Sequence, residues 1–287
     1  MKAFILDRYG SADRVRAGDM PDPELREDDV LVQVHAAGVN LLDSKIRNGE
    51  FKLILPYRLP LVLGHDVAGV VVRVGSRVRR FKPGDEVYAR LADGRIGAFA
   101  EFSAIKEDDV AIKPKALTME EAASIPLVGL TAWQALIERA NLKQGQKVLI
   151  HAGSGGVGTF AIQLAKHVGA TVATTTSTAN VDLVRSLGAD VVIDYKNEDF
   201  AGASWVLRIF MGFVSYGIRA KAKRRRAHYS FLFMRANGGQ LAELTSLIDN
   251  EIIRPVVDRV FPFASTKEAM AYVEAGRAKG KVVVSLR

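Results

Sequence analysis

The chain has 287 residues, of which 48% are hydrophobic and 25% charged, a mixture typical of a folded globular protein with room for two domains. Because the chain has no cysteine, disulfides, cysteine-ligated zinc, iron–sulfur clusters and cysteine nucleophiles are excluded. No apolar run reaches the about 18 residues of a membrane-spanning helix, and no secretory signal is recognised at the N-terminus. We therefore expect a cytoplasmic protein.

The net charge of +8 is concentrated in one segment. Residues 201–234 contain seven basic and no acidic side chains, so the remainder of the chain is nearly neutral. This distribution argues against a nucleic-acid partner. An apolar stretch followed by basic residues, together 205–226, could contact a membrane surface, but a partly buried helix with a basic C-terminal end is the favoured interpretation.

Residues 1–115 are predicted to be mostly β-structure. Short runs rich in β-branched residues alternate with turns that contain Pro and Gly, and these runs are 30–34, 67–74, 86–89 and 99–103. Such spacing favours an antiparallel barrel or sandwich. The capping box of Thr118 and Glu121 then predicts a helix, and helical spacing recurs over residues 130–140.

Strands and helices alternate after residue 146. In chain order we expect a strand at 148–151, a helix at 156–168, a strand at 171–175, a helix at 180–187 and a strand at 191–194. This order indicates parallel strands joined by crossover helices. A second capping box, formed by Ser265 and Glu268, predicts a helix that ends near residue 276, and a final strand is expected at 281–286.

A glycine-rich turn joins the first of these strands to its helix. Gly153, Gly155 and Gly158 form the pattern G-x-G-x-x-G between an apolar strand and a helix, the context of a dinucleotide-binding fingerprint. The first glycine permits the tight turn, the second lets the backbone approach a pyrophosphate, and the third lets the helix pack against the strand. The helix N-terminus offers free N–H groups to the phosphates. A glycine-rich turn in an unrelated α/β domain is the alternative interpretation.

The end of the second parallel strand bears on the choice between NAD and NADP. Residues 174–180 read TTTSTAN, and no acid occurs before Asp182. An NAD site usually places Asp or Glu there to hold the ribose 2′-OH. A carboxylate would repel a 2′-phosphate, whereas hydroxyls and an amide can donate to it. The stretch therefore favours NADP(H), and the alternative is a Thr-rich strand end with no role in binding.

Together these features resemble the medium-chain dehydrogenase/reductase superfamily, in its zinc-free quinone-oxidoreductase-like branch. The resemblance covers most of the chain, and its motifs are AGVNLLD at 37–43, LGHDVAG at 63–69, FKPGD at 81–85, VGLTAW at 128–133, AGSGGVG at 152–158, LGAD at 187–190 and GRAKGK at 276–281. It implies an α/β protein with a GroES-like β-barrel catalytic domain, 1–120 completed by about 255–287, and a Rossmann NADP-binding domain, 121–254. It also implies hydride transfer from NADPH to quinones or other α,β-unsaturated carbonyls, and a homodimer.

The resemblance further implies which residues form the site. Asn40 and Thr131 would lie at the nicotinamide end, the glycine-rich turn would hold the pyrophosphate, and a polar group would surround the adenosine and its 2′-phosphate. The complete cofactor-binding set is Asn40, Thr131, Gly153, Ser154, Gly155, Gly156, Val157, Gly158, Thr176, Ser177, Asn180 and Tyr195.

Asn40 and Lys45 are the candidate catalytic residues, and Lys45 stands where related quinone reductases often have Tyr. No metal is expected, because zinc requires three or four ligands and His65 occurs without a neighbouring Cys. His65 is therefore expected to be structural or pocket-lining. Without zinc, a developing oxyanion must be stabilised by hydrogen-bond donors or water, and the candidates are Lys45, a backbone N–H and the cofactor ribose hydroxyl.

After Phe200 the chain departs from the family pattern. A complete Rossmann domain has six strands, but relative to the family pattern about 40–50 residues, roughly one βαβ unit, are predicted to be missing near 200–204. The loss of two central strands would expose an edge of the first strand. Three explanations are open: a segment missing from the sequence, a truncated variant with impaired folding, or an inward movement of residues 229–234. The alternative to an active reductase is therefore a catalytically weak NADPH-binding or sensing protein.

Overall fold

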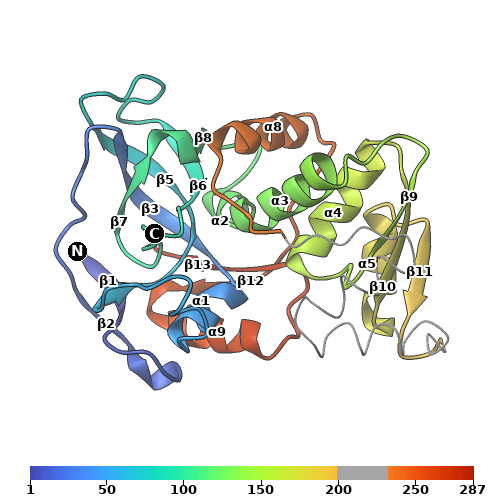
Figure 1. The fold of residues 1–287 in the computed structure, drawn as a ribbon, viewed down its shortest axis with the longest axis horizontal. Coiled ribbons are helices and arrows are strands. Elements are labelled where there is room, and N and C mark those ends of the chain that lie inside the picture. Colours follow the sequence, from blue (N-terminus) through green and yellow to red (C-terminus); the bar gives the residue numbers. More distant parts are fainter. Residues whose placement is uncertain (199–231) are drawn as a thin grey trace.

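The computed structural model describes residues 1–198 and 232–287. Two parts lie side by side: a β-rich part built from both ends of the chain, and a smaller parallel sheet with helices against it (Figure 1). The expected shortening near 200–204 and the apolar and basic segment 205–226 lie outside the described residues, as do residues 229–231.

A seven-stranded sheet dominates the β-rich part. Its order is β12-β13-β3-β5-β6-β8, with β7 paired to β3. The strands are β3 (Asp29–Val39), β5 (Asp66–Val74), β6 (Glu86–Arg90), β7 (Phe102–Lys106), β8 (Val110–Ile112), β12 (Val257–Pro262) and β13 (Lys281–Ser285). A second sheet, β2-β1-β4, contains β1 (Lys2–Leu6), β2 (Val15–Asp19) and β4 (Leu61–Val62). The prediction that the first 115 residues are mainly antiparallel β-structure is confirmed.

One predicted strand is displaced. The run 99–103 was expected to form a strand, but β7 begins only at Phe102. The preceding residues pair elsewhere: the Phe99 N–H donates to the Leu63 carbonyl over 2.9 Å, and the Phe99 carbonyl accepts from the Phe4 N–H over 2.9 Å. The backbone groups of this run are therefore divided between two sheets, and the β-branched pattern alone does not reveal that division.

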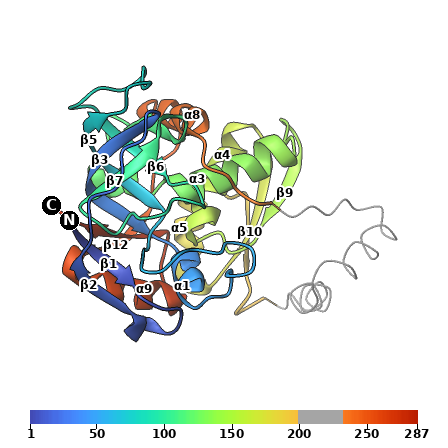
Figure 2. The same ribbon diagram turned by 60° about the vertical axis from the view of Figure 1, so that its left-hand side comes forward.

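β3 is the central strand of the large sheet and positions the site. It pairs with β5, β7 and β13, and most of its side chains are buried. It ends at Val39, and α1 (Leu41–Arg47) begins one residue after Asn40. Figure 2 shows α1 beside α9 (Thr266–Glu274), where Arg47 forms an ion pair with Glu274 at 2.8 Å. α1 and α9, which come from opposite ends of the chain, are thus joined next to Asn40, the residue that follows β3.

Both predicted helix starts are confirmed, but only the first has the capping hydrogen bonds that its motif predicts. Thr118 caps α2 (Met119–Ala123): its N–H donates to the Glu121 carboxylate over 2.9 Å, and its hydroxyl accepts from the Glu121 N–H over 3.2 Å. Ser265 instead ends a 3-10 turn with φ −98° and ψ 24°, and its side chain makes no capping hydrogen bond. An N-cap residue typically has extended backbone angles, so α9 begins directly after Ser265 without the predicted capping box.

Two further helices connect the parts. The helical spacing over 130–140 belongs to α3 (Pro126–Trp133), which continues as a π-helix over Gln134–Arg139. α8 (Gly238–Asp249) packs against α3 and the β8 side of the large sheet. Residues 232–237, which lead into α8, form no regular secondary structure. The described residues of the 229–234 stretch therefore add no strand to the parallel sheet.

The predicted alternation of strands and helices is confirmed after residue 146. The elements are β9 (Lys147–Ile150), α4 (Gly156–His167), β10 (Thr171–Thr176), α5 (Val181–Ser186) and β11 (Val191–Asp194). The strands are parallel and lie in the order β11-β10-β9. Within the described residues this sheet has three strands, and β9 pairs with β10 alone. Because residues 199–231 lie outside the described structure, the expected exposed edge of the first parallel strand stays a prediction.

One face of the parallel sheet is covered and the other is open. Ile150 and Val172 are buried in the same core cluster as Phe160 of α4. The adjacent cross-strand row contains Leu149, Ala173 and Val191. Leu149 is 47% exposed and Val191 is 51% exposed. The row is apolar on a surface that the described residues leave in contact with solvent.

Candidate active site

The glycine-rich turn between β9 and α4 has two closely packed glycines and one open glycine. A Cβ added to Gly153 would lie 2.1 Å from the Thr174 hydroxyl oxygen, and one added to Gly158 would lie 2.3 Å from the Ala152 carbonyl oxygen. A Cβ on Gly155, the N-cap of α4, would meet a single described atom within 4 Å, the Ala152 oxygen at 3.4 Å. The space beside Gly155 is therefore free for a ligand to approach the backbone.

A polar cluster lies beside this turn at the end of β10. The Thr176 hydroxyl donates to the Ser154 hydroxyl over 3.0 Å, and the Asn180 amide donates over 3.2 Å to the hydroxyls of Ser154 and Ser177. The Oδ1 atom of Asn180 is buried and has no hydrogen-bond partner among the described residues. Tyr195 is 55% exposed, and its backbone N–H donates to the Thr176 carbonyl. The structure thus brings together the polar residues expected around the adenosine.

An open pocket of about 260 Å³ lies where the N-terminus of α4 meets the β-rich part. Gly156 and Val157 from α4 line one wall, and Asn40 and Lys281 are the polar side chains in the lining. The remaining lining is mostly aliphatic and includes Leu41, Leu42, Leu127, Val128, Val273 and Val282. The pocket therefore combines an apolar surface with a small number of buried polar groups, which is typical of a small-molecule site.

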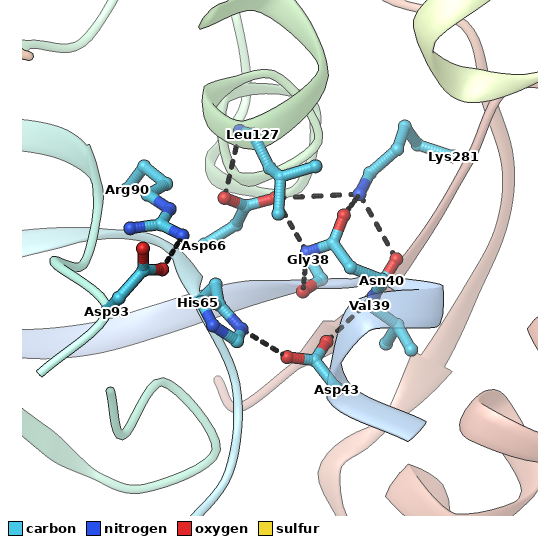
Figure 3. Close-up of polar contacts among 10 residues, drawn as sticks. All are labelled: Gly38, Val39, Asn40, Asp43, His65, Asp66, Arg90, Asp93, Leu127 and Lys281. Carbon is cyan, nitrogen blue, oxygen red and sulfur yellow. Dashed lines mark hydrogen bonds and ion pairs between the residues drawn. The ribbon is translucent and has the colours of Figure 1, made fainter. Parts of the chain in front are cut away.

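Three side chains from distant parts of the chain form a buried network at the base of this pocket (Figure 3). The Asn40 amide donates to an Asp66 carboxylate oxygen over 2.9 Å, and its oxygen accepts from the Lys281 ammonium group. The Lys281 ammonium also donates to the Val39 carbonyl over 3.1 Å and lies 3.5 Å from the Asp66 carboxylate. The second Asp66 oxygen accepts from the Leu127 N–H over 2.9 Å. The network therefore joins β3, β5, β13 and α3.

Asp66 and Lys281 form an ion pair that is shielded from water, with 0% and 4% of their surfaces exposed. Burial raises the pKa of Asp66, and the nearby Lys281 charge and the Asn40 hydrogen bond oppose this effect. Burial likewise lowers the pKa of Lys281, against the charge of Asp66. Each group therefore depends on the other to remain charged. Neither residue was predicted to belong to the site, although both lie within recognised motifs.

Asp43 extends the network to His65. One Asp43 oxygen accepts from the Asn40 backbone N–H over 2.8 Å, and the other lies 2.5 Å from His65 Nδ1. Both side chains are completely buried, and His65 Nε2 has no hydrogen-bond partner among the described residues. In residues 1–198 and 232–287, no three His, Asp or Glu side chains gather as a candidate metal site. The structure places His65 in the interior beside the Asn40 network.

Two predicted site residues lie outside both the polar cluster at the end of β10 and the pocket. Lys45 is half-buried in α1 and is not part of the pocket lining. Thr131 lies in α3, where its hydroxyl donates to the Leu127 carbonyl over 2.6 Å. The structure therefore collects Asn40, Gly156 and Val157 at the pocket. The roles proposed for Lys45 and Thr131 remain predictions.

The fold and the site together define a class of protein. A barrel-like β-domain that is joined to a Rossmann-type unit, with a pocket beside the glycine-rich turn, is the arrangement of a dehydrogenase or reductase. Among the described residues, no helix has the length and apolar character needed to cross a membrane.

Comparison with known proteins identifies the family. The model of the alcohol dehydrogenase GroES-like domain matches residues 26–115, and two zinc-binding dehydrogenase models match residues 156–220 and 209–284. The chain belongs to the medium-chain dehydrogenase/reductase superfamily, in the quinone-oxidoreductase-like branch, and is by this membership an oxidoreductase. The family resemblance and the two-part α/β fold expected from the sequence are thereby confirmed.

Similar proteins cover nearly the whole chain. The 2-methylene-furan-3-one reductase of Solanum lycopersicum is 40% identical over 307 residues, which span 99% of this chain and 79% of that protein. The chloroplastic NADPH-dependent alkenal/one oxidoreductase of Arabidopsis thaliana is 39% identical over the same shares of each chain. The structure of the quinone oxidoreductase from Coxiella burnetii matches with a TM-score of 0.91 and 33% identity, and covers 100% of this chain and 99% of that one.

Proposed function

We propose that this protein is an NADPH-dependent reductase of quinones or other α,β-unsaturated carbonyls that acts without zinc. The observation that carries this proposal is the junction of the glycine-rich turn with the pocket. Gly156 and Val157 begin α4 and also line the pocket, so a dinucleotide held at the helix N-terminus reaches the pocket directly. The names of the tomato and Arabidopsis relatives support reduction of conjugated carbonyl compounds.

The residues present suit NADP(H). Open space beside Gly155 and the free N–H groups at the start of α4 fit a pyrophosphate. The unpartnered Asn180 oxygen would accept a hydrogen bond from a ribose or adenine donor. The hydroxyls of Ser154, Thr176 and Ser177 lie around the Asn180 side chain, and β10 carries no carboxylate that would repel a 2′-phosphate. The name of the Arabidopsis relative also specifies NADPH.

The pocket supplies an apolar environment for the reaction. When bound, NADPH provides the hydride that reduces the electron-poor carbon, and a proton from solvent or a pocket donor completes the reduction. Leu41, Val128 and Val273 exclude water and accept an apolar ring or enone. Asn40 shapes the wall beside them, because both ends of its amide are already hydrogen-bonded. Lys45 lies outside this lining, and it stays one of three candidate donors to the carbonyl oxygen, beside a backbone N–H and the ribose hydroxyl of the cofactor.

The catalytic domain in this proposal comprises residues 1–120 completed by 255–287, and the NADP-binding domain comprises 121–254. The pairing of β13 with β3 supports this division, because a strand from the end of the chain lies within the first sheet. We also propose that the protein is cytoplasmic and forms a homodimer. Sedimentation of the purified protein tests the dimer, since a monomer mass at all concentrations would exclude it.

A catalytically weak NADPH-binding or sensing protein is the second candidate. Two observations favour it: the parallel sheet has three strands in the described residues, and the 307-residue alignment with the tomato relative is longer than this chain. A sheet that lacks central strands would lack part of the wall at the nicotinamide end.

One pair of measurements separates the two candidates. NADPH oxidation is followed with a panel of quinones and enones, and NADPH binding is titrated by fluorescence on the same sample. Turnover that requires both substrate and NADPH supports the reductase. Binding without turnover across the panel supports the sensor. A folded sample that binds no NADPH contradicts both, and a loss of activity on dialysis against a zinc chelator would contradict the zinc-free mechanism.

A further inference from the structure

We propose that Lys281 is a positioning residue that couples the glycine-rich turn to Asn40 in the pocket. This inference rests on the proposed reductase function, and it gives a role to a residue that the sequence analysis did not single out. Lys281 is 4% exposed and comes from β13, whereas Asn40 lies at the end of β3. Lys281 therefore acts through Asn40, and none of the described contacts requires it to touch a reacting atom.

The main chain and the stem of Lys281 are set by the glycine-rich turn. Gly280 donates its N–H to the Ser154 carbonyl over 2.8 Å and forms a parallel bridge with Gly155. A Cβ added to Gly156 would lie 3.0 Å from Lys281 Cδ, so the aliphatic stem lies directly against the first residue of α4. A displacement of the turn would therefore move Lys281.

The ammonium group sets the orientation of Asn40. Lysine has three N–H donors, and in this site three acceptors surround them: the Asn40 side-chain oxygen, the Val39 carbonyl and the Asp66 carboxylate. Asp66 accepts from the Asn40 amide nitrogen. Lys281 can only donate to the amide oxygen of Asn40, and Asp66 can only accept from its amide nitrogen. Only one of the two orientations of the Asn40 amide therefore satisfies both charged groups.

The absence of cysteine from the chain permits a chemical test at this single position. The Lys281→Cys variant is alkylated in urea and refolded. Bromoethylamine restores an ammonium group through a side chain close in length to lysine (the aminoethyl form), whereas bromopropane gives a neutral side chain of the same length (the propyl form). Lys279→Cys, treated identically, is the matched control, because Lys279 is exposed on the loop that leads into β13. Wild-type protein taken through the same cycle shows the yield of refolding.

We expect the two Lys281→Cys forms to bind NADPH with dissociation constants within threefold of each other, because the stem against Gly156 is retained. Turnover should be about 100-fold slower in the propyl form than in the aminoethyl form, because a shift of about 1 Å in the reacting groups can lower the rate by about that factor. The two Lys279→Cys forms should not differ. Equal turnover of the propyl and aminoethyl forms would overturn the proposal, as would a propyl form that fails to refold or to bind NADPH, because Lys281 would then serve folding or binding alone.

A readout without cofactor tests the same inference independently of activity. In protein labelled with ¹⁵N-asparagine, the Asn40 side-chain signals are identified by their loss in Asn40→Ser. The aminoethyl form should show two resolved amide proton signals at the wild-type positions, and the propyl form should show shifted or exchange-averaged signals. Identical spectra would overturn the role of Lys281. If the wild type has no reductase activity the proposed function fails, whereas these spectra still decide whether Lys281 orients Asn40.

Discussion

Alanine at Gly158 and alanine at Gly155 should affect different properties of the protein. At Gly158 the new Cβ would lie 2.3 Å from the Ala152 oxygen and 2.7 Å from Gly153 Cα, and both are backbone atoms that cannot rotate away. Ala152 already has φ 54°, in the left-handed region, so the turn has little freedom to relax. Overpacking of this kind should lower the free energy of unfolding by about 3 kcal/mol.

At Gly155 the same substitution should leave stability nearly unchanged. Its φ is −83°, which alanine adopts readily, and the nearest described atom would be 3.4 Å away. The preference of an N-cap for glycine over alanine is offset by the lower entropy of the unfolded alanine chain, so we expect a change within about 1 kcal/mol. In the proposed function, however, the methyl group would fill the space beside Gly155 that is assigned to the pyrophosphate. Losing two charge-assisted hydrogen bonds, at about 1.5–3 kcal/mol each, should weaken NADPH binding about 100-fold or more.

Urea unfolding followed by circular dichroism measures stability, and fluorescence titration of NADPH measures binding on the folded fraction. Gly94→Ala is the control, because a Cβ there would have no described atom within 4 Å and both quantities should stay at their wild-type values. Wild-type NADPH affinity in Gly155→Ala would refute the placement of the phosphates. A Gly158→Ala protein as stable as Gly155→Ala would refute the packing argument.

Four further substitutions test the pH response, helix capping and cofactor choice. Burial raises the pKa of Asp29, but the two hydrogen bonds and the charge of Arg95 bring this pKa below its usual value. Arg95→Met should therefore lower the free energy of unfolding by about 3 kcal/mol at pH 7, and this cost should shrink as the pH falls from about 5 to 2. Urea unfolding at a series of pH values measures the cost, and an equal cost at pH 7 and pH 2 would contradict the reasoning. Thr118→Ala should cost about 1 kcal/mol in urea unfolding and Ser265→Ala less than about 0.5 kcal/mol, since only Thr118 makes a cap hydrogen bond; equal costs would argue against the assigned caps. Asn180→Asp should weaken NADPH binding about tenfold more than NADH binding, measured by fluorescence titration, and a uniform loss would move the 2′-phosphate away from this residue.

Local patterns account for the features that the sequence predicted well. The glycine-rich turn has fixed spacing and a neighbouring strand and helix, and the surroundings of Gly155 and Gly158 fit the roles predicted for them. The alternation of β9, α4, β10, α5 and β11 follows from hydrophobic periodicity over short windows. These predictions needed no knowledge of contacts between distant residues.

The network at the pocket could not be predicted in the same way. Lys281 and Asp66 are 215 positions apart, and no periodic pattern relates a buried cation to a buried anion at that separation. Asn40 was recognised as a site residue, but its hydrogen bonds to both charges depend on β3, β5 and β13 meeting in one sheet. Ser265 shows the opposite error: its local motif correctly marked a helix start, but Ser265 ends a 3-10 turn and its side chain makes no capping hydrogen bond.

The position of β13 in the large sheet has a consequence for biosynthesis. This strand pairs with β3 on one side and with β12 on the other, so the sheet cannot form its final order until residues after the whole nucleotide-binding unit have left the ribosome. Until then Asp66 lacks its counter-ion, and enclosing its charge would be costly. We therefore expect the nascent N-terminal part to stay open at Asp66, and the two parts of the protein to mature together rather than in the order of their synthesis.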